Sequence, residues 1–300
     1  MSGQLRNLRK RIRSVESTKK ITRAMEMVST AKLKRFQNKV AQAKPFLEGL
    51  ERLVQRLSQN QQAFKNAASG KTAGTVLHPF FAGREEKQNA LILVTSDTGL
   101  CGSYNHDLAG LARKFIQEQK KLPILLAIGK TGIAALKQAG YECHKSWSRV
   151  RTDQLPAMFG ELKTEIENIF LQNKADAVYV ISSHMLGKTT YKADSIKLLP
   201  FAAPKEDSQQ PATASDLIYE PSPEIIFEKL IPVYFEAKIR MLFFEAYISE
   251  QLARMNAMHQ ATKNAEEMID SLVLLRNKIR QATITNEIIE VASGSKALKR

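Results

Sequence analysis

A short polar stretch with two glycines, TSDTGLCGSYN at residues 95–105, is the first place in the sequence where chemistry can be sought. It follows the apolar run ALILV at 90–94, and the turn after a buried strand is where α/β sheets commonly bind phosphate. Its glycines match neither G-x-G-x-x-G nor G-x-x-x-x-G-K-[ST], so the backbone donors that a pyrophosphate needs are not arranged in either known way. The sequence therefore favours a tight structural turn over a nucleotide site.

The other candidate groups do not form a catalytic or metal-binding pattern. GKTG at 129–132 lacks the first glycine of a phosphate-binding loop. Asp97 and His106 have no accompanying nucleophile, and Cys101 and Cys143 form neither a metal motif nor a disulfide framework. The five histidines show no pair at ligand spacing: His78, His106, His144, His184 and His259. We therefore predict no catalytic, cofactor-binding or metal-binding residue, although an α/β enzyme, suggested by the buried strands and the GLCG turn, remains an alternative at this point.

Basic residues are concentrated at the amino end of the chain. Lys and Arg exceed Asp and Glu by 15 over the whole sequence, and residues 1–40 hold twelve basic but only two acidic side chains. Such a block predicts an anionic partner, which is nucleic acid, a phospholipid surface or an acidic protein. Phe36 is the only aromatic residue before Phe46, so side chains for base stacking are nearly absent. We favour an acidic protein, and a basic coiled-coil protein that binds nucleic acid is the alternative.

Long helical patterns lie at both ends of the chain, and the first of them carries these basic residues. Apolar residues recur in steps of three and four over residues 1–58 and again from residue 223 onward. From Phe36 the steps average 3.5 residues, a period that specifies a left-handed supercoil with a partner helix. Pro45 interrupts the first pattern, and we expect a kink there because the pattern resumes in phase at Leu47. One helix enters the middle of the chain and the other leaves it, so we predict a long antiparallel two-helix coiled coil.

Between these helices, apolar runs alternate with helical patterns. Continuous apolar runs that end in polar residues are typical of strands buried on both faces, and their alternation with helices indicates a mostly parallel sheet. The predicted fold is therefore an α/β Rossmann-like domain joined to the coiled coil. The expected strands are ALILVTSD (90–97), PILLAIG (123–129), DAVYVISS (176–183) and DSIKLLPF (194–201).

Two segments without a periodic apolar pattern connect the long helices to the α/β domain. Residues 59–89 contain QNQQ, ASGKTAG and AGREEKQ and are predicted to be a loop or insertion, with a short strand around residues 75–77. Residues 202–222 have the composition of a polar linker with prolines. No continuous apolar stretch approaches the length of about 18 residues that a membrane-spanning helix needs. The expected parts are the N-terminal coiled-coil helix (1–58), the loop or insertion (59–89), the α/β domain (90–201), the linker (202–222) and the C-terminal coiled-coil helix with its tip (223–300).

Motifs in these elements resemble the gamma subunit of F-type ATP synthases. They are IRSVESTKKITRAMEMVSTAKLKR (12–35), TSDTGLCGSYN (95–105), and ARMNAMHQATKNAEEMI (253–269) with RQATITNEIIEVASG (280–294). Thr98 and Ser103 depart from the family, which usually has Arg and Gly at these positions. The resemblance implies a non-catalytic central-stalk rotor that mechanically couples ion flow through the membrane sector to ATP synthesis or hydrolysis at the beta subunits.

The resemblance also implies partners, a location and interface residues. The partners would be the alpha, beta and epsilon subunits and the c-ring, with no nucleic acid and only indirect membrane association. The location would be the cytoplasmic face of the bacterial plasma membrane, or an organellar inner membrane if a transit peptide has been removed. Lys19, Lys20 and Arg23 would form a basic collar that faces acidic segments of beta. The other implied residues would contact beta directly. The residues so implied are Lys19, Lys20, Arg23, Met25, Arg280, Gln281, Thr285 and Glu290.

Overall fold

The computed structural model describes two compact units. The helical unit contains the described residues up to Ala31 and from Arg254 onward, and the α/β unit contains those between Lys32 and Ala253. Two long helices each contribute to both units: α1 (Ser2–Ala68) and α5 (Pro223–Leu298). The described residues are 2–68, 78–81, 83–151, 153–187, 190–201, 220 and 223–298.

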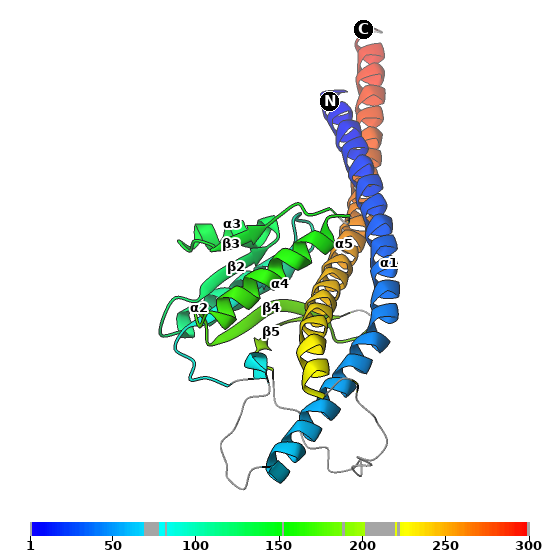
Figure 1. Ribbon diagram of the computed structural model, residues 1–300. Helices are drawn as coiled ribbons and strands as arrows, with labels where there is room; N and C mark the ends of the chain where they lie inside the picture. The colour runs from blue at the N-terminus through cyan, green and yellow to red at the C-terminus, as the bar shows by residue number, and fades with distance from the viewer. Residues whose placement is uncertain are drawn as a thin grey trace. The chain divides into compact units, whose positions relative to one another are not determined.

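A five-stranded mixed sheet forms the centre of the α/β unit (Figure 1). Its strand order is β3-β2-β1-β4-β5, in which the first four strands are parallel and β5 runs antiparallel to β4. Every residue of β1 is buried, as its continuous apolar run predicts for a strand covered on both faces. The expected mostly parallel α/β sheet is confirmed. The strands are β1 (Asn89–Val94), β2 (Ile124–Ile128), β3 (Lys145–Trp147), β4 (Ala177–Met185) and β5 (Tyr191–Leu199).

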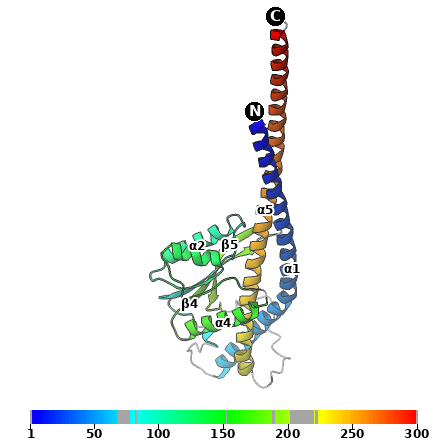
Figure 2. The same ribbon diagram turned by 90° about the horizontal axis from the view of Figure 1, so that it is seen from above.

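Helices cover both faces of this sheet. Alternate residues of a strand point to opposite faces, so a strand that is apolar throughout presents apolar side chains on both faces, and both must be covered. Leu91 and Leu93 of β1 pack in one cluster with α2 and α3, whereas Ile92 and Val94 pack in another with α4 and parts of α1 and α5. Figure 2 shows α2 and α4 on opposite sides of the sheet. The α/β unit is therefore a three-layer structure. Its shorter helices are α2 (Tyr104–Glu118), α3 (Lys130–Gln138) and α4 (Leu155–Leu171).

A short segment without a periodic apolar pattern contributes a side chain to an aromatic cluster in the core. The short 3-10 helix η1 (Pro79–Phe81) places Phe80 in the core, where its ring centroid lies 5.9 Å from Phe170 and 5.1 Å from Phe235. Such pairs stabilise a core beyond their buried area. The predicted loop or insertion at 59–89 therefore contributes a core residue to the α/β unit.

The long helices differ in detail from the expected boundaries. α1 continues to Ala68, ten residues beyond the predicted end at 58, and it runs through Pro45 without ending. The extension, QNQQAFKNAA, is rich in residues with good helix propensity even though its apolar period is lost. None of the helices in the described part of the chain combines the length and apolar character needed to cross a bilayer. The expected strand near residues 75–77 and most of the predicted linker lie outside the described residues.

Candidate functional site

A buried hydroxyl pair joins α1 to α5 in the helical unit. The Oγ1 atoms of Thr22 and Thr262 lie 2.8 Å apart, and these side chains are only 9% and 8% exposed. The Thr22 hydroxyl also lies 3.0 Å from the Lys19 carbonyl oxygen, and that of Thr262 lies 2.8 Å from the carbonyl oxygen of Met258. Buried hydroxyls need such partners because an unpaired polar group away from water is costly. The pair therefore fixes which residues of the two helices meet.

A Lys–Glu ion pair and a His–Glu hydrogen bond flank the hydroxyl pair. Lys19 Nζ lies 3.0 Å from Glu266 Oε1, and His259 Nδ1 lies 2.9 Å from Glu26 Oε1. The hydrogen bond and charge of Lys19, with a smaller contribution from Arg23, hold the pKa of Glu266 below its usual value of 4.5. Residue numbers rise along α1 while those of the partners on α5 fall. At these contacts the two helices therefore run in opposite directions.

All eight residues implied by the resemblance lie in the helical unit. Lys19 and Met25 are partly buried, whereas the other six are exposed. The structure brings Lys19 and Arg23 close to Glu266, a residue that the sequence analysis did not select. Thr285 and Gln281 lie one turn apart, and the Thr285 hydroxyl donates to the Gln281 carbonyl at 2.9 Å. The six exposed residues are Lys20, Arg23, Arg280, Gln281, Thr285 and Glu290.

The sequence analysis missed Thr262, Glu266 and His259 as partners of α1. All three lie inside the motif at 253–269 that resembles the family, but the motif does not indicate that they contact α1. Their pairing depends on the register between positions about 240 residues apart, as for Thr22 and Thr262. A periodic pattern on one helix carries no information about that register.

The last part of α5 exposes large apolar side chains. Ile288 is 63% exposed and Val291 is 74% exposed, and Ile284 and Ile289 are also on the surface. Scattered apolar residues are normal on protein surfaces, but a contiguous group of them on one helix segment indicates a contact surface. The arginine and glutamine at 280 and 281 lie at the start of this segment.

Contacts between α1 and α5 also occur in the α/β unit. The Tyr234 hydroxyl donates to Glu51 Oε1 at 3.3 Å and accepts from Lys238 Nζ at 3.0 Å. Burial lowers the pKa of Lys238, and the charge of Glu51 partly offsets this effect. The Phe36 ring lies 4.2 Å from that of Tyr247, centroid to centroid. The two helices are thus joined by polar and aromatic contacts in this unit as well.

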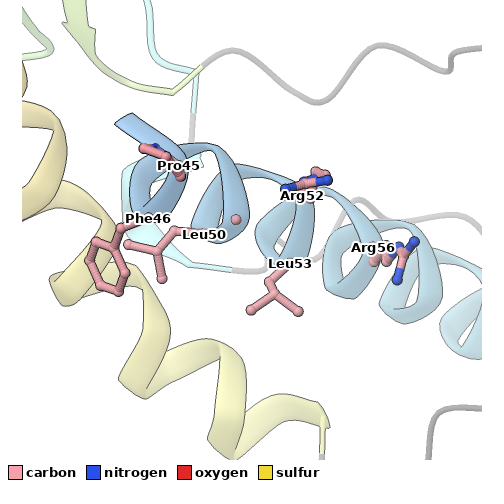
Figure 3. Close-up of a pocket in the computed structure, with 7 residues that line it drawn as sticks. Pro45, Phe46, Leu50, Arg52, Leu53 and Arg56 are labelled. Carbon is pink, nitrogen blue, oxygen red and sulfur yellow. The ribbon is translucent and has the colours of Figure 1, made fainter. Parts of the chain in front are cut away.

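A shallow open hollow of about 460 Å³ lies along α1 in the α/β unit. Figure 3 shows Phe46 and Leu53 pointing to the same side of α1, with Arg52 on the other side. The two guanidinium groups supply no acid, base or nucleophile, so this hollow does not resemble a catalytic site. It is lined by Pro45, Phe46, Gly49, Leu50, Arg52, Leu53 and Arg56.

The turn at 95–105 has many of its polar groups bonded within the α/β unit. The Asn105 side-chain oxygen accepts from the backbone N–H of Ser96 at 3.0 Å, and Asp97 Oδ1 accepts from the backbone N–H of Lys130 at 2.9 Å. Cys101 is buried and is a free thiol. Among the residues that the structure describes, no three His, Cys, Asp or Glu side chains gather closely enough to hold a metal ion. The turn thus has the internal bonding of the predicted structural turn.

The chain is similar over its whole length to known proteins. The family model described as ATP synthase matches residues 4–298. The "ATP synthase gamma chain" of Moorella thermoacetica is 38% identical over 297 residues, which cover 99% of this chain and 100% of that protein. The protein of the same name from Fusobacterium nucleatum is 34% identical, with 98% and 99% covered.

Solved structures show the same fold at lower identity. A chain of the Euglena gracilis mitochondrial ATP synthase aligns with a TM-score of 0.63 and 14% identity, covering 99% of this chain and 95% of that one. A chain from the central stalk and c-ring structure of the Tetrahymena thermophila enzyme aligns with a TM-score of 0.58 and 19% identity, covering 80% and 99%. The family match and the full-length relatives lead to one conclusion: this chain belongs to the ATP synthase gamma chain family.

Proposed function

We propose that this chain is the central-stalk rotor subunit of an F-type ATP synthase. In this role it couples ion flow through the membrane sector to ATP synthesis or hydrolysis at the beta subunits. The observation that carries the proposal is similarity to gamma chains from end to end, at 38% identity for the Moorella thermoacetica protein. The comparisons give no support to the alternative of a nucleic-acid-binding protein. The chemistry would belong to the complex, and this chain would contribute no catalytic group.

The shaft of the rotor would be an antiparallel coiled coil of α1 and α5. Support comes from the buried Thr22–Thr262 pair in the helical unit and from the Phe36–Tyr247 contact in the α/β unit. A supercoiled pair resists twisting better than a single helix because each helix supports the apolar face of the other. Such a shaft can transmit torque along its length.

Rotation of this shaft would act on the catalytic sites through its asymmetry. A single chain inside a ring of three alternating alpha and beta pairs cannot contact the three beta subunits in the same way. Turning the shaft therefore changes which site is closed. Because such coupling between binding equilibria is reciprocal, hydrolysis can turn the shaft and torque on the shaft can drive synthesis.

The proposed partners are the alpha, beta and epsilon subunits and the c-ring. The exposed isoleucines and valine at 284–291 fit an apolar sleeve of alpha and beta subunits, and the exposed basic residues of α1 fit acidic segments of beta. Membrane association would be indirect, through the membrane sector at the cytoplasmic face of the bacterial plasma membrane.

Purification of the native chain tests this function. The rotor assignment requires that the chain emerges with alpha and beta subunits, and that a complex lacking it loses ATP-driven ion pumping. If the chain emerges with nucleic acid and without those subunits, it is not a rotor. Measurable ATP turnover by the isolated chain would separately contradict its non-catalytic role.

Charge reversal in the basic collar should impair coupling more than folding. With Lys20→Glu and Arg23→Glu combined, we expect ATP-driven ion pumping by the assembled complex to fall about fivefold, since these exposed charges would face acidic protein. Lys19→Glu is measured separately, because Lys19 forms an ion pair with Glu266 at 3.0 Å that the reversal would break. Pumping and thermal unfolding are recorded at low and high salt, and salt should reduce the difference from the unmodified chain.

The matched control reverses Lys34 and Arg35, which are equally exposed on α1 but lie in the α/β unit. This control should leave pumping near the unmodified level. Equal losses in both double variants would mean that total charge matters and that the collar has no specific role.

A further inference from the structure

A histidine occupies the capping position of the short helix η1. The backbone N–H of Phe80 donates to Nδ1 of His78 at 3.2 Å, and the backbone N–H of Phe81 donates to the His78 carbonyl oxygen at 2.9 Å. Side-chain acceptors before a helix usually belong to Asn, Asp, Ser or Thr, which bond the otherwise unpaired N–H groups of the first turn. In this chain an imidazole nitrogen takes that role.

This hydrogen bond requires a neutral imidazole. A neutral histidine carries its proton on one ring nitrogen and accepts on the other, whereas both nitrogens of the protonated ring are donors. Because Nδ1 of His78 accepts from the Phe80 N–H, the ring proton must lie on Nε2, and a second proton can bind only at Nδ1. Protonation therefore replaces the acceptor of this bond with a donor, and the cap is lost.

The capped turn connects several parts of the α/β unit. The buried Phe80 ring lies 6.1 Å from that of Phe201, centroid to centroid, and the Phe80 carbonyl oxygen accepts from the Phe201 N–H at 2.7 Å. The Phe81 ring lies 5.8 Å from that of Phe227, which belongs to the first turns of α5. The turn η1 thus joins the chain that follows β5 to the start of α5, and loss of its cap would loosen this joint.

The surroundings of His78 favour the neutral ring. The side chain is partly buried, and its ring lies edge to face with that of Phe80, with the centroids 4.8 Å apart. Burial lowers the pKa of His78 below its usual value of 6.5, and the negative charge of Glu228 partly offsets this effect. Since the pKa is lowered in the folded state, the contribution of the cap to stability is complete above pH 6.5 and is lost as the pH falls through the lowered pKa.

The charged groups around the cap come from more than one element. Two cations lie over rings that contact Phe80: Arg84, which follows η1, and Lys238, on α5. Glu228, also on α5, is the acidic group that acts on His78. A proton on His78 would therefore be attracted by Glu228 and opposed, at longer range, by the two cations. The two protonation states thus favour different partners, the Phe80 N–H for the neutral ring and Glu228 for the charged ring.

We propose that His78 is an acid-sensitive cap that anchors the start of α5 in the α/β unit: the neutral ring holds η1 in the aromatic cluster, and protonation releases it. Acidification then loosens the joint between η1, Phe201 and α5, while the parallel strands keep their hydrogen bonds. The inference concerns the α/β unit alone and does not rest on the proposed rotor function.

Amide hydrogen exchange of the full-length chain tests this proposal. The rate of each amide is compared with that of an unfolded peptide at the same pH, which removes the intrinsic effect of pH on exchange. In the unmodified chain, protection of the Phe80 and Phe201 amides should fall about fivefold between about pH 7.5 and about pH 5, the effect of losing one hydrogen bond. The amides of β1 should keep their protection. Unchanged protection at Phe80, or an equal fall throughout β1, would overturn the proposal.

Substitution separates His78 from other groups that titrate in this range. Asparagine offers a side-chain oxygen to the same N–H but does not titrate, so His78→Asn should keep the protection of Phe80 at both pH values. His106→Asn is the matched control, because His106 is exposed on α2, and it should reproduce the fall seen in the unmodified chain. If His78→Asn shows the same fall, another group is responsible and the proposal fails.

Glu228→Gln tests the direction of the electrostatic effect. Removing this negative charge takes away an attraction for the protonated ring of His78, so the fall in protection should move to lower pH. Glu142→Gln removes the same charge from an exposed position between α3 and β3, and it should leave the midpoint of the fall in place. A midpoint that does not move in Glu228→Gln would contradict the assignment of the acid response to His78.

Discussion

Replacing Arg280 and Gln281 together with alanine should slow ATP hydrolysis by the assembled complex about tenfold, the effect of losing about 1.4 kcal/mol of contact energy. Both side chains are exposed on α5, so the substitutions should disturb the packing of the helical unit little. Alanine also has the highest helix propensity, so the helix itself should persist. The rate of hydrolysis is measured in the reconstituted complex, and circular dichroism of the free chain reports whether it folds.

A control for this pair combines Gln260→Ala with Lys263→Ala. These two residues are likewise exposed on α5 in the helical unit and reproduce the loss of one amide and one cation. We expect the control to hydrolyse ATP at close to the unmodified rate. If the Arg280 and Gln281 variant is equally active, these residues have no part in coupling.

The second large effect is expected at Gly129, where alanine should destabilise the chain by on the order of 3 kcal/mol. Gly129 has a φ of +98°, and a Cβ there would collide with the backbone carbonyl of Thr95. The glycine cannot move away easily, because its N–H donates to the Trp147 carbonyl at 2.8 Å. The Gly132 N–H likewise donates to Thr95 Oγ1 at 2.8 Å. Denaturant unfolding of the full chain measures the change.

Gly160→Ala is the matched control and should have the opposite sign. Gly160 lies in α4, is exposed, and would have no atom within 4 Å of an added Cβ. Alanine there should stabilise the chain by about 0.5–1 kcal/mol through helix propensity. If Gly129→Ala is as stable as the unmodified chain, the close approach of the two loops does not constrain the fold.

Several elements follow directly from local pattern. ALILV predicts a strand covered on both faces because continuous apolar residues cannot be hidden by covering one face only, and β1 is indeed buried throughout. The long helices follow from apolar steps of three and four, and α5 spans Pro223–Leu298 as one element. The predicted start at residue 223 agrees with the structure, and this residue is a proline, which suits the first turn of a helix.

Other elements have no local signal. β3 consists of only Lys145–Trp147 and is a strand because Leu126 to Ile128 of β2 pair with it. Phe80 lies in a stretch without periodicity and enters the core through contacts with Phe170 and Phe235, which are distant in the sequence. Such elements are stabilised by their partners and not by their own propensity, so single-sequence reasoning misses them.

By itself, the sequence determined the kinds of elements, their order and the motifs that resemble a rotor subunit, because these depend on residue types at short spacing. Only the tertiary structure decided which distant residues meet. Thr22 and Thr262 are 240 positions apart, and their pairing depends on helix register. The turn at 95–105, considered first as a phosphate site, is another case. The Tyr104 hydroxyl at the end of this turn donates to the Ala246 carbonyl oxygen of α5, and only the folded α/β unit brings these two segments together.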